Sequence, residues 1–125
     1  MEVITQHLCK TSDVGLHGNI FGGTILGWLD AAGFLLASRI CHTPHLMTLK
    51  FEEVIFAKPI QQGDVISIYG SVKKMGDTSI TIYLEVRKWG FFPEKEEEMM
   101  TSTTVVFVKI DPKTRRSTSI NHGKN

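Results

Sequence analysis

The fold is decided by residues 17–41, which read HGNIFGGTILGWLDAAGFLLASRIC. Apolar residues recur in this stretch at spacings of three and four, the period of one face of an α-helix. This pattern predicts a single long helix over residues 23–41, whose apolar face packs against other parts of the chain. The predicted apolar face consists of Ile25, Leu29, Ala32, Leu36 and Ile40.

The opposite face of this predicted helix is built mainly of small residues, where an ordinary solvent face would carry lysines and glutamates. Asp30 is the only ionisable residue of the helix before Arg39. A carboxylate in an apolar setting is costly unless it is paired or hydrogen-bonded, and such positions are often functional. Asp30 is therefore a candidate catalytic residue; the alternative is an exposed or locally hydrogen-bonded side chain without a function.

Two glycines, Gly22 and Gly23, stand at the start of the helix. Free backbone N–H groups at a helix N-terminus can polarise a carbonyl group or hold an oxyanion, although a tight turn without a ligand is an alternative. At 1.5 Å per residue, Gly22 and Asp30 lie roughly 12 Å apart along one helix, too far to act on one carbonyl. Two such helices packed antiparallel across a two-fold axis would bring Gly22 of one subunit to Asp30 of the other. The spacing therefore predicts a site shared between two subunits.

The rest of the chain is typical of β-structure. The clearest strand begins at residue 78, because apolar and polar residues alternate from there to residue 87. A solvated connection is expected over residues 90–100, where glutamates and a proline cluster. The expected strands cover residues 2–10, 46–56, 65–74, 78–87 and 101–110.

These elements predict an α+β fold in which an antiparallel β-sheet wraps around one long central α-helix. With 125 residues, the chain has room for one domain. We expect this domain to cover residues 1–112, followed by a polar, flexible C-terminal tail over residues 113–125.

Composition excludes some classes of function. The net charge of +1 gives no global field that would attract nucleic acid or an anionic membrane. The longest apolar run, residues 25–36, is shorter than the roughly 20 residues that a bilayer requires, so no membrane span is expected. Cys9 and Cys41 lack the close pairing of a zinc or redox motif, and the five histidines show no metal-ligand spacing. We therefore expect reduced thiols, a cytoplasmic protein and no metal.

Residues 17–33, together with Thr48 and the stretch FAKPIQQGDV over residues 56–65, resemble the acyl-CoA thioesterases of the hot-dog superfamily. The similarity extends over nearly the whole chain and is to the YciA-type enzymes of bacteria and the brain-type acyl-CoA hydrolases of animals. It implies hydrolysis of acyl-CoA to a free carboxylic acid and CoA, a role in lipid metabolism, and no cofactor beyond the CoA of the substrate. It also implies a homodimer that assembles further into a tetramer or hexamer.

The resemblance assigns roles to four residues. Asp30 would act as a general base on water, or as a nucleophile that forms a transient anhydride. The N–H of Gly22 would polarise the thioester carbonyl, Asn19 would orient the thioester or the water, and Thr48 would position the attacking water.

The resemblance also implies a substrate-binding set. Gly23 would assist Gly22, and Phe21 would lie near the acyl chain. The turn containing Gly76, Thr78 and Ser79 would lie near the pantetheine and nucleotide arm. Related enzymes often carry a basic residue where Asp77 stands, so the candidates for binding the CoA phosphates are Lys58, Lys73, Lys74, Arg115 and Arg116.

Two alternatives remain open at this point. A hot-dog hydratase or dehydratase needs a catalytic histidine in the helix or its entry loop, and the predicted helix contains none. A non-catalytic acyl-CoA-binding or sensing module would keep the pocket without turnover. The presence of Asp30 with Asn19 and the glycine pair favours the enzyme, because binding alone gives no reason to place an acid beside a thioester.

Overall fold

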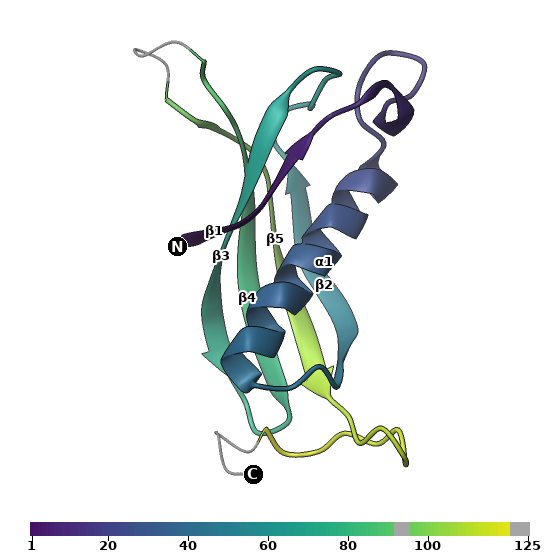
Figure 1. The fold of residues 1–125 in the computed structure, drawn as a ribbon, viewed down its shortest axis with the longest axis vertical. Coiled ribbons are helices and arrows are strands. Elements are labelled where there is room, and N and C mark those ends of the chain that lie inside the picture. The colour runs from purple at the N-terminus through teal and green to yellow at the C-terminus, as the bar shows by residue number, and fades with distance from the viewer. Residues whose placement is uncertain (92–95, 121–125) are drawn as a thin grey trace.

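The computed structural model describes residues 1–91 and 96–120. In this part of the chain, one long helix packs on a five-stranded antiparallel sheet (Figure 1). The predicted α+β arrangement, a sheet around one helix, is confirmed. The elements are β1 (Glu2–Leu8), a short 3-10 helix η1 (Thr11–Asp13), α1 (Gly22–Cys41), β2 (Leu46–Phe56), β3 (Val65–Met75), β4 (Ser79–Lys88) and β5 (Glu98–Lys109).

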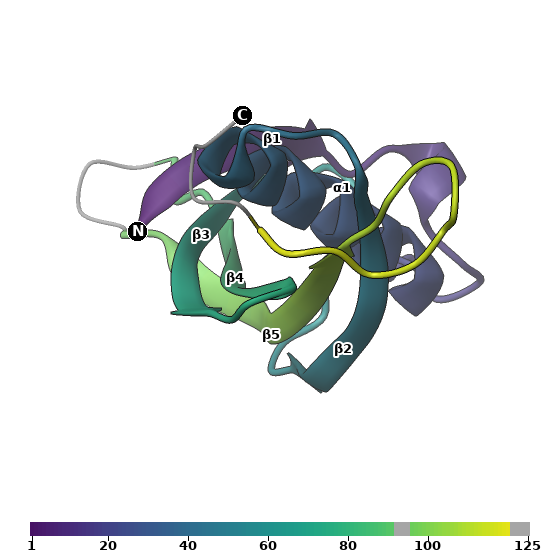
Figure 2. The same cartoon turned by 90° about the horizontal axis from the view of Figure 1, so that it is seen from below.

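The strand order in the sheet is β1-β3-β4-β5-β2. The first two strands along the chain are therefore the two edges of the sheet, and β4 lies at its centre. Seen from below, β3, β4, β5 and β2 curve around one side of α1 (Figure 2). This curvature gives the helix one face buried against the sheet and leaves another face uncovered.

The predicted apolar face of α1 forms the core, with one exception. Four of its five residues are buried, and they meet the alternating apolar side chains of β4, which are also buried. Ile40 is 40% exposed and lines a shallow hollow with Met1 and Val72, so the expectation that it is buried is wrong. The buried residues are Ile25, Leu29, Ala32 and Leu36 on α1, and Ile80, Ile82, Leu84 and Val86 on β4.

Gly33 lets α1 pack tightly against the sheet. A Cβ atom at this position would lie 3.0 Å from the ring of Phe107, which is fully buried in β5. This contact is tighter than most real Cβ contacts, so the absence of a side chain at Gly33 allows the helix to rest directly on the ring.

The last strand begins earlier than predicted. Residues 98–100, expected in the solvated connection, belong to β5, and Met100 is buried. The carbonyl group of Met100 accepts hydrogen bonds from the N–H groups of Ala57 and Lys58, which extends the pairing beyond the end of β2. Residues 92–95 of the predicted connection lie outside the described residues.

The C-terminal segment packs on the domain at least as far as Ile120. The side chain of Ile120 is 2% exposed, and its N–H group donates a 2.6 Å hydrogen bond to the carbonyl group of Asp77. The division of the chain into a domain over residues 1–112 and a tail over residues 113–125 stays a prediction. Such a tail would include one residue of the hydrophobic core.

The length of α1 corrects the membrane argument made from the apolar run alone. The helix has 20 residues and a mean hydropathy of 1.3 in its most apolar window, so by length and composition it could cross a bilayer. The core helix of a soluble protein passes the same test. In this fold, α1 packs one face on the sheet.

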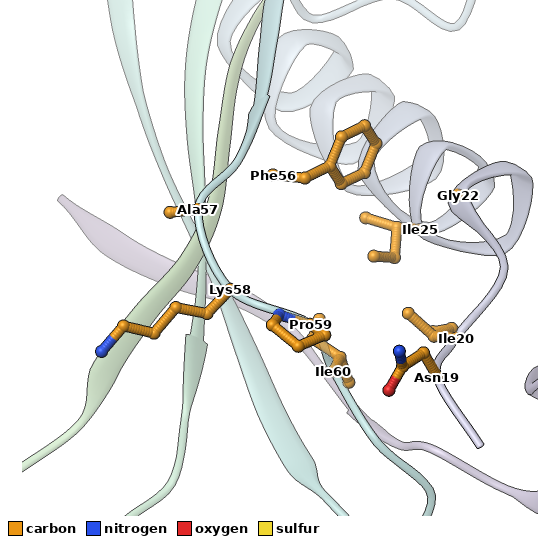
Figure 3. A pocket seen from close by; sticks show the side chains of 9 residues that line it. All are labelled: Asn19, Ile20, Gly22, Ile25, Phe56, Ala57, Lys58, Pro59 and Ile60. Atoms are coloured by element: carbon orange, nitrogen blue, oxygen red, sulfur yellow. The ribbon is translucent and has the colours of Figure 1, made fainter. Parts of the chain in front are cut away.

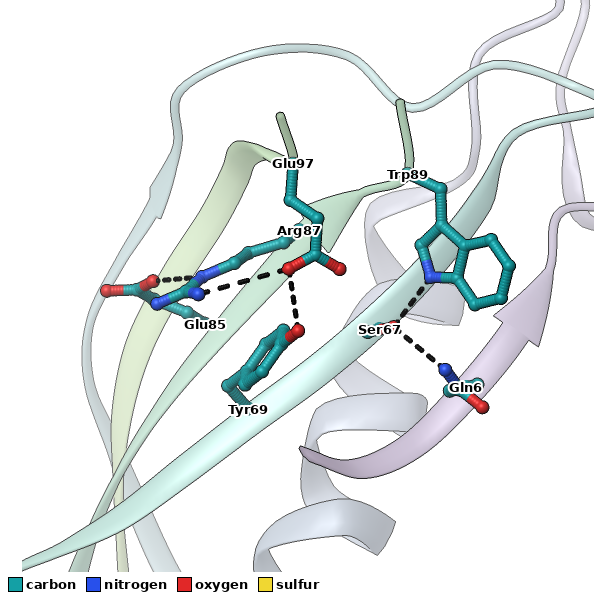
Figure 4. Close-up of polar contacts among 7 residues, drawn as sticks. All are labelled: Gln6, Ser67, Tyr69, Glu85, Arg87, Trp89 and Glu97. Atoms are coloured by element: carbon teal, nitrogen blue, oxygen red, sulfur yellow. Dashed lines mark hydrogen bonds and ion pairs between the residues drawn. The ribbon is translucent and has the colours of Figure 1, made fainter. Parts of the chain in front are cut away.

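The face of the sheet turned away from α1 carries a polar network (Figure 4). The guanidinium group of Arg87 lies 4.2 Å from the centre of the Tyr69 ring and donates a 2.9 Å hydrogen bond to Glu85. The hydroxyl groups of Tyr69 and Tyr83 donate to Glu97 and Glu85, each over 2.6 Å. The network ties β3, β4 and the segment before β5 together.

Candidate active site

Asp30 and Thr48 are in direct contact. The Thr48 hydroxyl donates a 2.6 Å hydrogen bond to Oδ1 of Asp30, and both side chains are half-buried. Thr48 is fixed by strand pairing, because it lies opposite Phe107 of β5. Asp30 stands in the middle of α1, on the face of small residues, and is half-buried beside β2. Helix and strand therefore hold the carboxylate in one orientation.

This contact leaves half of the carboxylate available for chemistry. An ionised carboxylate has two oxygens that accept hydrogen bonds, and Thr48 occupies one of them. No described residue donates to Oδ2 of Asp30. A carboxylate held in this way can accept a proton from water or attack a carbonyl carbon directly.

An open pocket of about 340 Å³ lies at the N-terminal end of α1. Its walls are mostly apolar, and the side-chain amide of Asn19 is its main polar group facing inward (Figure 3). Asn19 is held by a backbone bridge to Gln61 and by its carbonyl group, which accepts the N–H of Gly15 over 3.0 Å. The lining residues are Asn19, Ile20, Gly22, Ile25, Phe56, Ala57, Lys58, Pro59 and Ile60.

Gly22 lines this pocket with its backbone. It is the first residue of α1; further along the first turn, the N–H groups of Thr24 and Ile25 both donate to the carbonyl group of Phe21. No described residue accepts the N–H of Gly22. This group also stands at the positive end of the helix dipole, so it is placed to bind a carbonyl oxygen or an oxyanion.

The structure does not bring these two groups of residues together within one chain. The pocket lining contains Gly22 and Asn19 but neither Asp30 nor Thr48. The two groups are therefore separate within one chain, and we call them the pocket half-site, with Asn19 and Gly22, and the carboxylate half-site, with Asp30 and Thr48.

Three residues predicted to bind substrate contribute less than expected to the pocket. Gly23 and Phe21 are exposed and do not line it, and the ring of Phe21 lies against Gly15 instead. Lys58 lines the pocket with its stem, while its ammonium group points away and forms an ion pair with Glu98 (Figure 3).

The predicted turn of Gly76, Thr78 and Ser79 lies at the other end of the molecule. The N–H of Gly76 donates a 2.8 Å hydrogen bond to the carbonyl group of Ser79, which closes the turn between β3 and β4. The carbonyl group of Thr78 accepts the N–H of Lys109, beside the start of β2. The turn is therefore on the side of the carboxylate half-site and distant from the pocket of its own chain.

Phe56 was not among the predicted site residues, yet its ring forms one wall of the pocket. A Cβ atom at Gly22 would meet this ring at 3.7 Å, which is ordinary van der Waals contact. The signal was available, because Phe56 opens the stretch FAKPIQQGDV. Among the residues that the structure describes, no three His, Cys, Asp or Glu side chains are close enough to hold a metal ion.

Comparison with known proteins gives consistent matches. Residues 17–89 match the model of the Thioesterase superfamily. The acyl-CoA thioester hydrolase YciA of Salmonella typhimurium is 32% identical over 113 residues, which are 89% of this chain and 84% of that protein.

Two solved structures have the same architecture. The aspartate-to-alanine variant of HI0827, a hexameric broad-specificity acyl-coenzyme A thioesterase, is 33% identical, with a TM-score of 0.87 over 99% of this chain and 89% of that one. Cj0915, a hexameric hot-dog-fold thioesterase of Campylobacter jejuni, is 29% identical, with a TM-score of 0.82 over 99% of this chain and 98% of that one.

Proposed function

Because the chain belongs to the Thioesterase superfamily, with the hot-dog fold, we propose that it hydrolyses acyl-CoA thioesters at a site that two subunits build together. The enzyme class follows from the relatives, which are named acyl-CoA thioester hydrolases. The products are a free carboxylic acid and CoA. The single observation that carries the catalytic proposal is the hydrogen bond from Thr48 to Asp30.

The free edge of β2 supports the shared site. β2 has a neighbouring strand on one side only, and several of its large apolar side chains are exposed. Pairing with a second β2 strand would remove these side chains from water. If two β2 strands meet antiparallel across a two-fold axis, the Thr48 end of one strand approaches the Phe56 end of its partner. That brings the carboxylate half-site to the partner's pocket half-site. The exposed side chains are Met47, Leu49, Ile55 and Phe56.

In the assembled site, the N–H of Gly22 binds the thioester carbonyl oxygen, and the Asn19 amide orients the thioester. Asp30 of the other subunit faces the carbonyl carbon. As a general base, Asp30 takes a proton from water, whose oxygen attacks the carbon; the C–S bond then breaks, and the CoA thiolate takes up the proton. As a nucleophile, Asp30 attacks the carbon itself, CoA leaves, and water cleaves the resulting anhydride.

These two routes differ in where the oxygen of water goes. In a single turnover in ¹⁸O-labelled water, the general-base route places the label in the released acid only. The nucleophilic route places it in the Asp30 carboxylate when water attacks the aspartyl carbonyl of the anhydride. Mass spectrometry of the peptide that contains Asp30 distinguishes them.

The experiment that tests the function is a thiol-release assay over a panel of acyl-CoAs of increasing chain length. We expect saturable release of free CoA, and the panel also gives the chain-length preference. Saturable binding of acyl-CoA without release would show a binding module and refute the enzyme. Asp30→Asn is the matched variant, and it should lose most turnover, on the order of 10²-fold or more, while still binding CoA.

Mixed subunits test the shared site. Homodimers of Asp30→Asn subunits and homodimers of Asn19→Ala subunits should both be inactive, because both of their sites lack one of the two groups. Mixed dimers should regain about one working site, because one interface then combines an intact carboxylate half-site with an intact pocket half-site. No recovery after verified subunit exchange would contradict the shared site. The solved relatives named above are hexameric, and we propose that these dimers assemble further in the same way.

A further inference from the structure

The cations of this protein are distributed unevenly. Five of the described lysines and arginines form ion pairs within 4.0 Å of a carboxylate: Arg39, Lys50, Lys58, Arg87 and Lys88. Those without such a pair in the described ranges are Lys10 and a group that we call the cationic end: Lys73, Lys74, Lys109, Lys113, Arg115 and Arg116. The cationic end combines the end of β3, the end of β5 and the segment that follows β5.

Residues 111–116 form a closed loop within the cationic end. The N–H of Asp111 donates to the carbonyl group of Arg116 over 2.8 Å, and the N–H of Arg115 donates to the carbonyl group of Asp111 over 2.7 Å. Arg115 adopts a left-handed backbone conformation with φ of 63°, which is uncommon for a residue with a side chain. The loop therefore has one defined shape.

The single carboxylate of this loop does not neutralise its cations. Oδ1 of Asp111 accepts the N–H groups of Lys113 and Thr114, at 2.7 and 3.1 Å. These backbone hydrogen bonds, that of Thr114 first, lower the pKa of Asp111. Asp111 thus shapes the loop, and the guanidinium groups of Arg115 and Arg116 remain exposed to solvent.

Asp77 anchors the loop to the turn between β3 and β4. Oδ1 of Asp77 accepts the hydroxyl of Ser119 over 2.9 Å, and its carbonyl group accepts the N–H of Ile120 over 2.6 Å. Two further contacts complete the attachment. The side chain of Ile120 is buried, and the N–H of Thr118 donates a 2.8 Å hydrogen bond to the carbonyl group of Lys109. An acid at position 77 therefore has a structural use here, since it holds a segment that carries two arginines.

The cationic end adjoins the carboxylate half-site. Lys109 pairs with Leu46, and the N–H of Ile110 donates a 3.0 Å hydrogen bond to the carbonyl group of His45. Leu46, the first residue of β2, and His45, just before the strand, precede Thr48 by two and three residues. A substrate whose reacting carbonyl lies at Asp30 can therefore extend toward the loop.

We propose that Arg115 and Arg116, held in place through Asp77, bind the phosphate groups of the acyl-CoA substrate. The inference rests on the proposed function and names the residues that recognise the nucleotide part. CoA carries its phosphates at the end of the pantetheine arm that is remote from the thioester. Guanidinium groups suit this role, because their planar set of donors matches two phosphate oxygens at once.

The test compares two substrates with the same acyl group, an acyl-CoA and an acyl-pantetheine, which lacks every phosphate. In the double variant Arg115→Ala, Arg116→Ala, the KM for acyl-CoA should rise about tenfold or more, since each charge-assisted hydrogen bond is worth about that factor. The KM for acyl-pantetheine and both kcat values should stay unchanged. Lys10→Ala, which removes an exposed cation elsewhere, is the control and should alter neither substrate.

Asp77→Ala tests the anchor. It should raise the KM for acyl-CoA selectively, as the double variant does, and leave the KM for acyl-pantetheine unchanged. An equal loss on both substrates would show a general structural defect and contradict the anchoring role. An unchanged KM for acyl-CoA in the double variant would overturn the inference while hydrolysis by the wild type upheld the function.

A binding measurement separates this inference from catalysis. Isothermal titration of the full-length protein with CoA and with pantetheine should show that the double variant loses affinity for CoA only. If the wild type hydrolysed neither substrate but this selective loss was found, the proposed reaction would fail and the phosphate site would stand. Equal CoA affinity in wild type and double variant would refute the site.

Discussion

Thr48 donates a 2.6 Å hydrogen bond to Oδ1 of Asp30, and so connects strand β2 to the middle of α1. The two residues are 18 positions apart in the sequence, and the contact exists because the sheet brings the first half of β2 beside the middle of the helix. A hydroxyl in this place fixes the orientation of the carboxylate and satisfies one of its oxygens.

Replacing Thr48 by valine should lower kcat about tenfold or more, because the side chain keeps its shape but no longer donates to Asp30. Thr48→Ser keeps the hydroxyl and should retain most activity. Steady-state kinetics with one acyl-CoA give the comparison. Equal activity of the valine and threonine proteins would show that the hydrogen bond does not serve catalysis.

Replacing Gly22 by proline should remove one catalytic group and preserve the helix. Proline lacks the N–H and is well tolerated at the first position of a helix. The preceding Phe21 has φ of −67° and ψ of 137°, a conformation that proline accepts in its neighbour. We expect kcat to fall about 10²-fold, the cost of one oxyanion-hole donor.

Gly22→Ala is the matched control for this variant, because alanine keeps the N–H and its Cβ meets the Phe56 ring at an ordinary 3.7 Å. Circular dichroism should show the same helix content in both variants. If alanine and proline reduced kcat equally, the effect would come from bulk in the pocket, and the role of the N–H would be wrong.

Glu85 should stabilise the fold in a pH-dependent way. Burial alone would raise the pKa of Glu85, but hydrogen bonds from Tyr83 and Arg87 and the charge of Arg87 outweigh it and lower the pKa. Because this pKa is lowered in the folded protein, ionised Glu85 stabilises the fold at pH values above its ordinary pKa of 4.5. This stabilisation is lost as the pH falls through the pKa of the folded state.

Glu85→Gln should therefore reduce the free energy of unfolding at pH 7 by on the order of 1 kcal/mol, and the difference from wild type should shrink toward pH 3. Thermal melts across this range measure it, with Glu96→Gln on the exposed segment before β5 as the control. A difference that stayed constant with pH would indicate a loss of packing and not of charge.

Ile120→Ala should reduce the free energy of unfolding by about 2–5 kcal/mol, the usual cost of deleting a buried isoleucine side chain beyond Cβ. Urea denaturation of the full chain measures the change, and Ser117→Ala, at an exposed position of the same segment, should have little effect. A tail that did not contribute to the fold would give no change for either variant.

Local patterns predicted the fold well. The spacing of Ile25, Leu29, Ala32 and Leu36 identified the buried face of α1, and the alternation after residue 78 identified β4. Both signals depend only on the period of the element. The predicted end of β2 at Phe56 is confirmed as well, because Pro59 and the turn that follows it stop the strand.

Three features could not be found in this way, because each depends on partners distant in sequence. Glu98 follows a run of acids typical of a loop, yet it begins β5 because β4 continues beside it. Ile120 is a single apolar residue in a polar segment, and its burial depends on the turn at Asp77. A catalytic role for Thr48 was implied only by the family resemblance, and its contact with Asp30 depends on the pairing of β2 in the sheet.

The separation of the carboxylate half-site from the pocket half-site has a consequence for handling the enzyme. A lone subunit can keep its fold and still lack any complete catalytic centre, so hydrolysis per milligram of protein should fall on dilution below the dissociation constant of the dimer. Specific activity would then report assembly, and substrate that bridges two subunits would hold them together at concentrations where the empty protein comes apart.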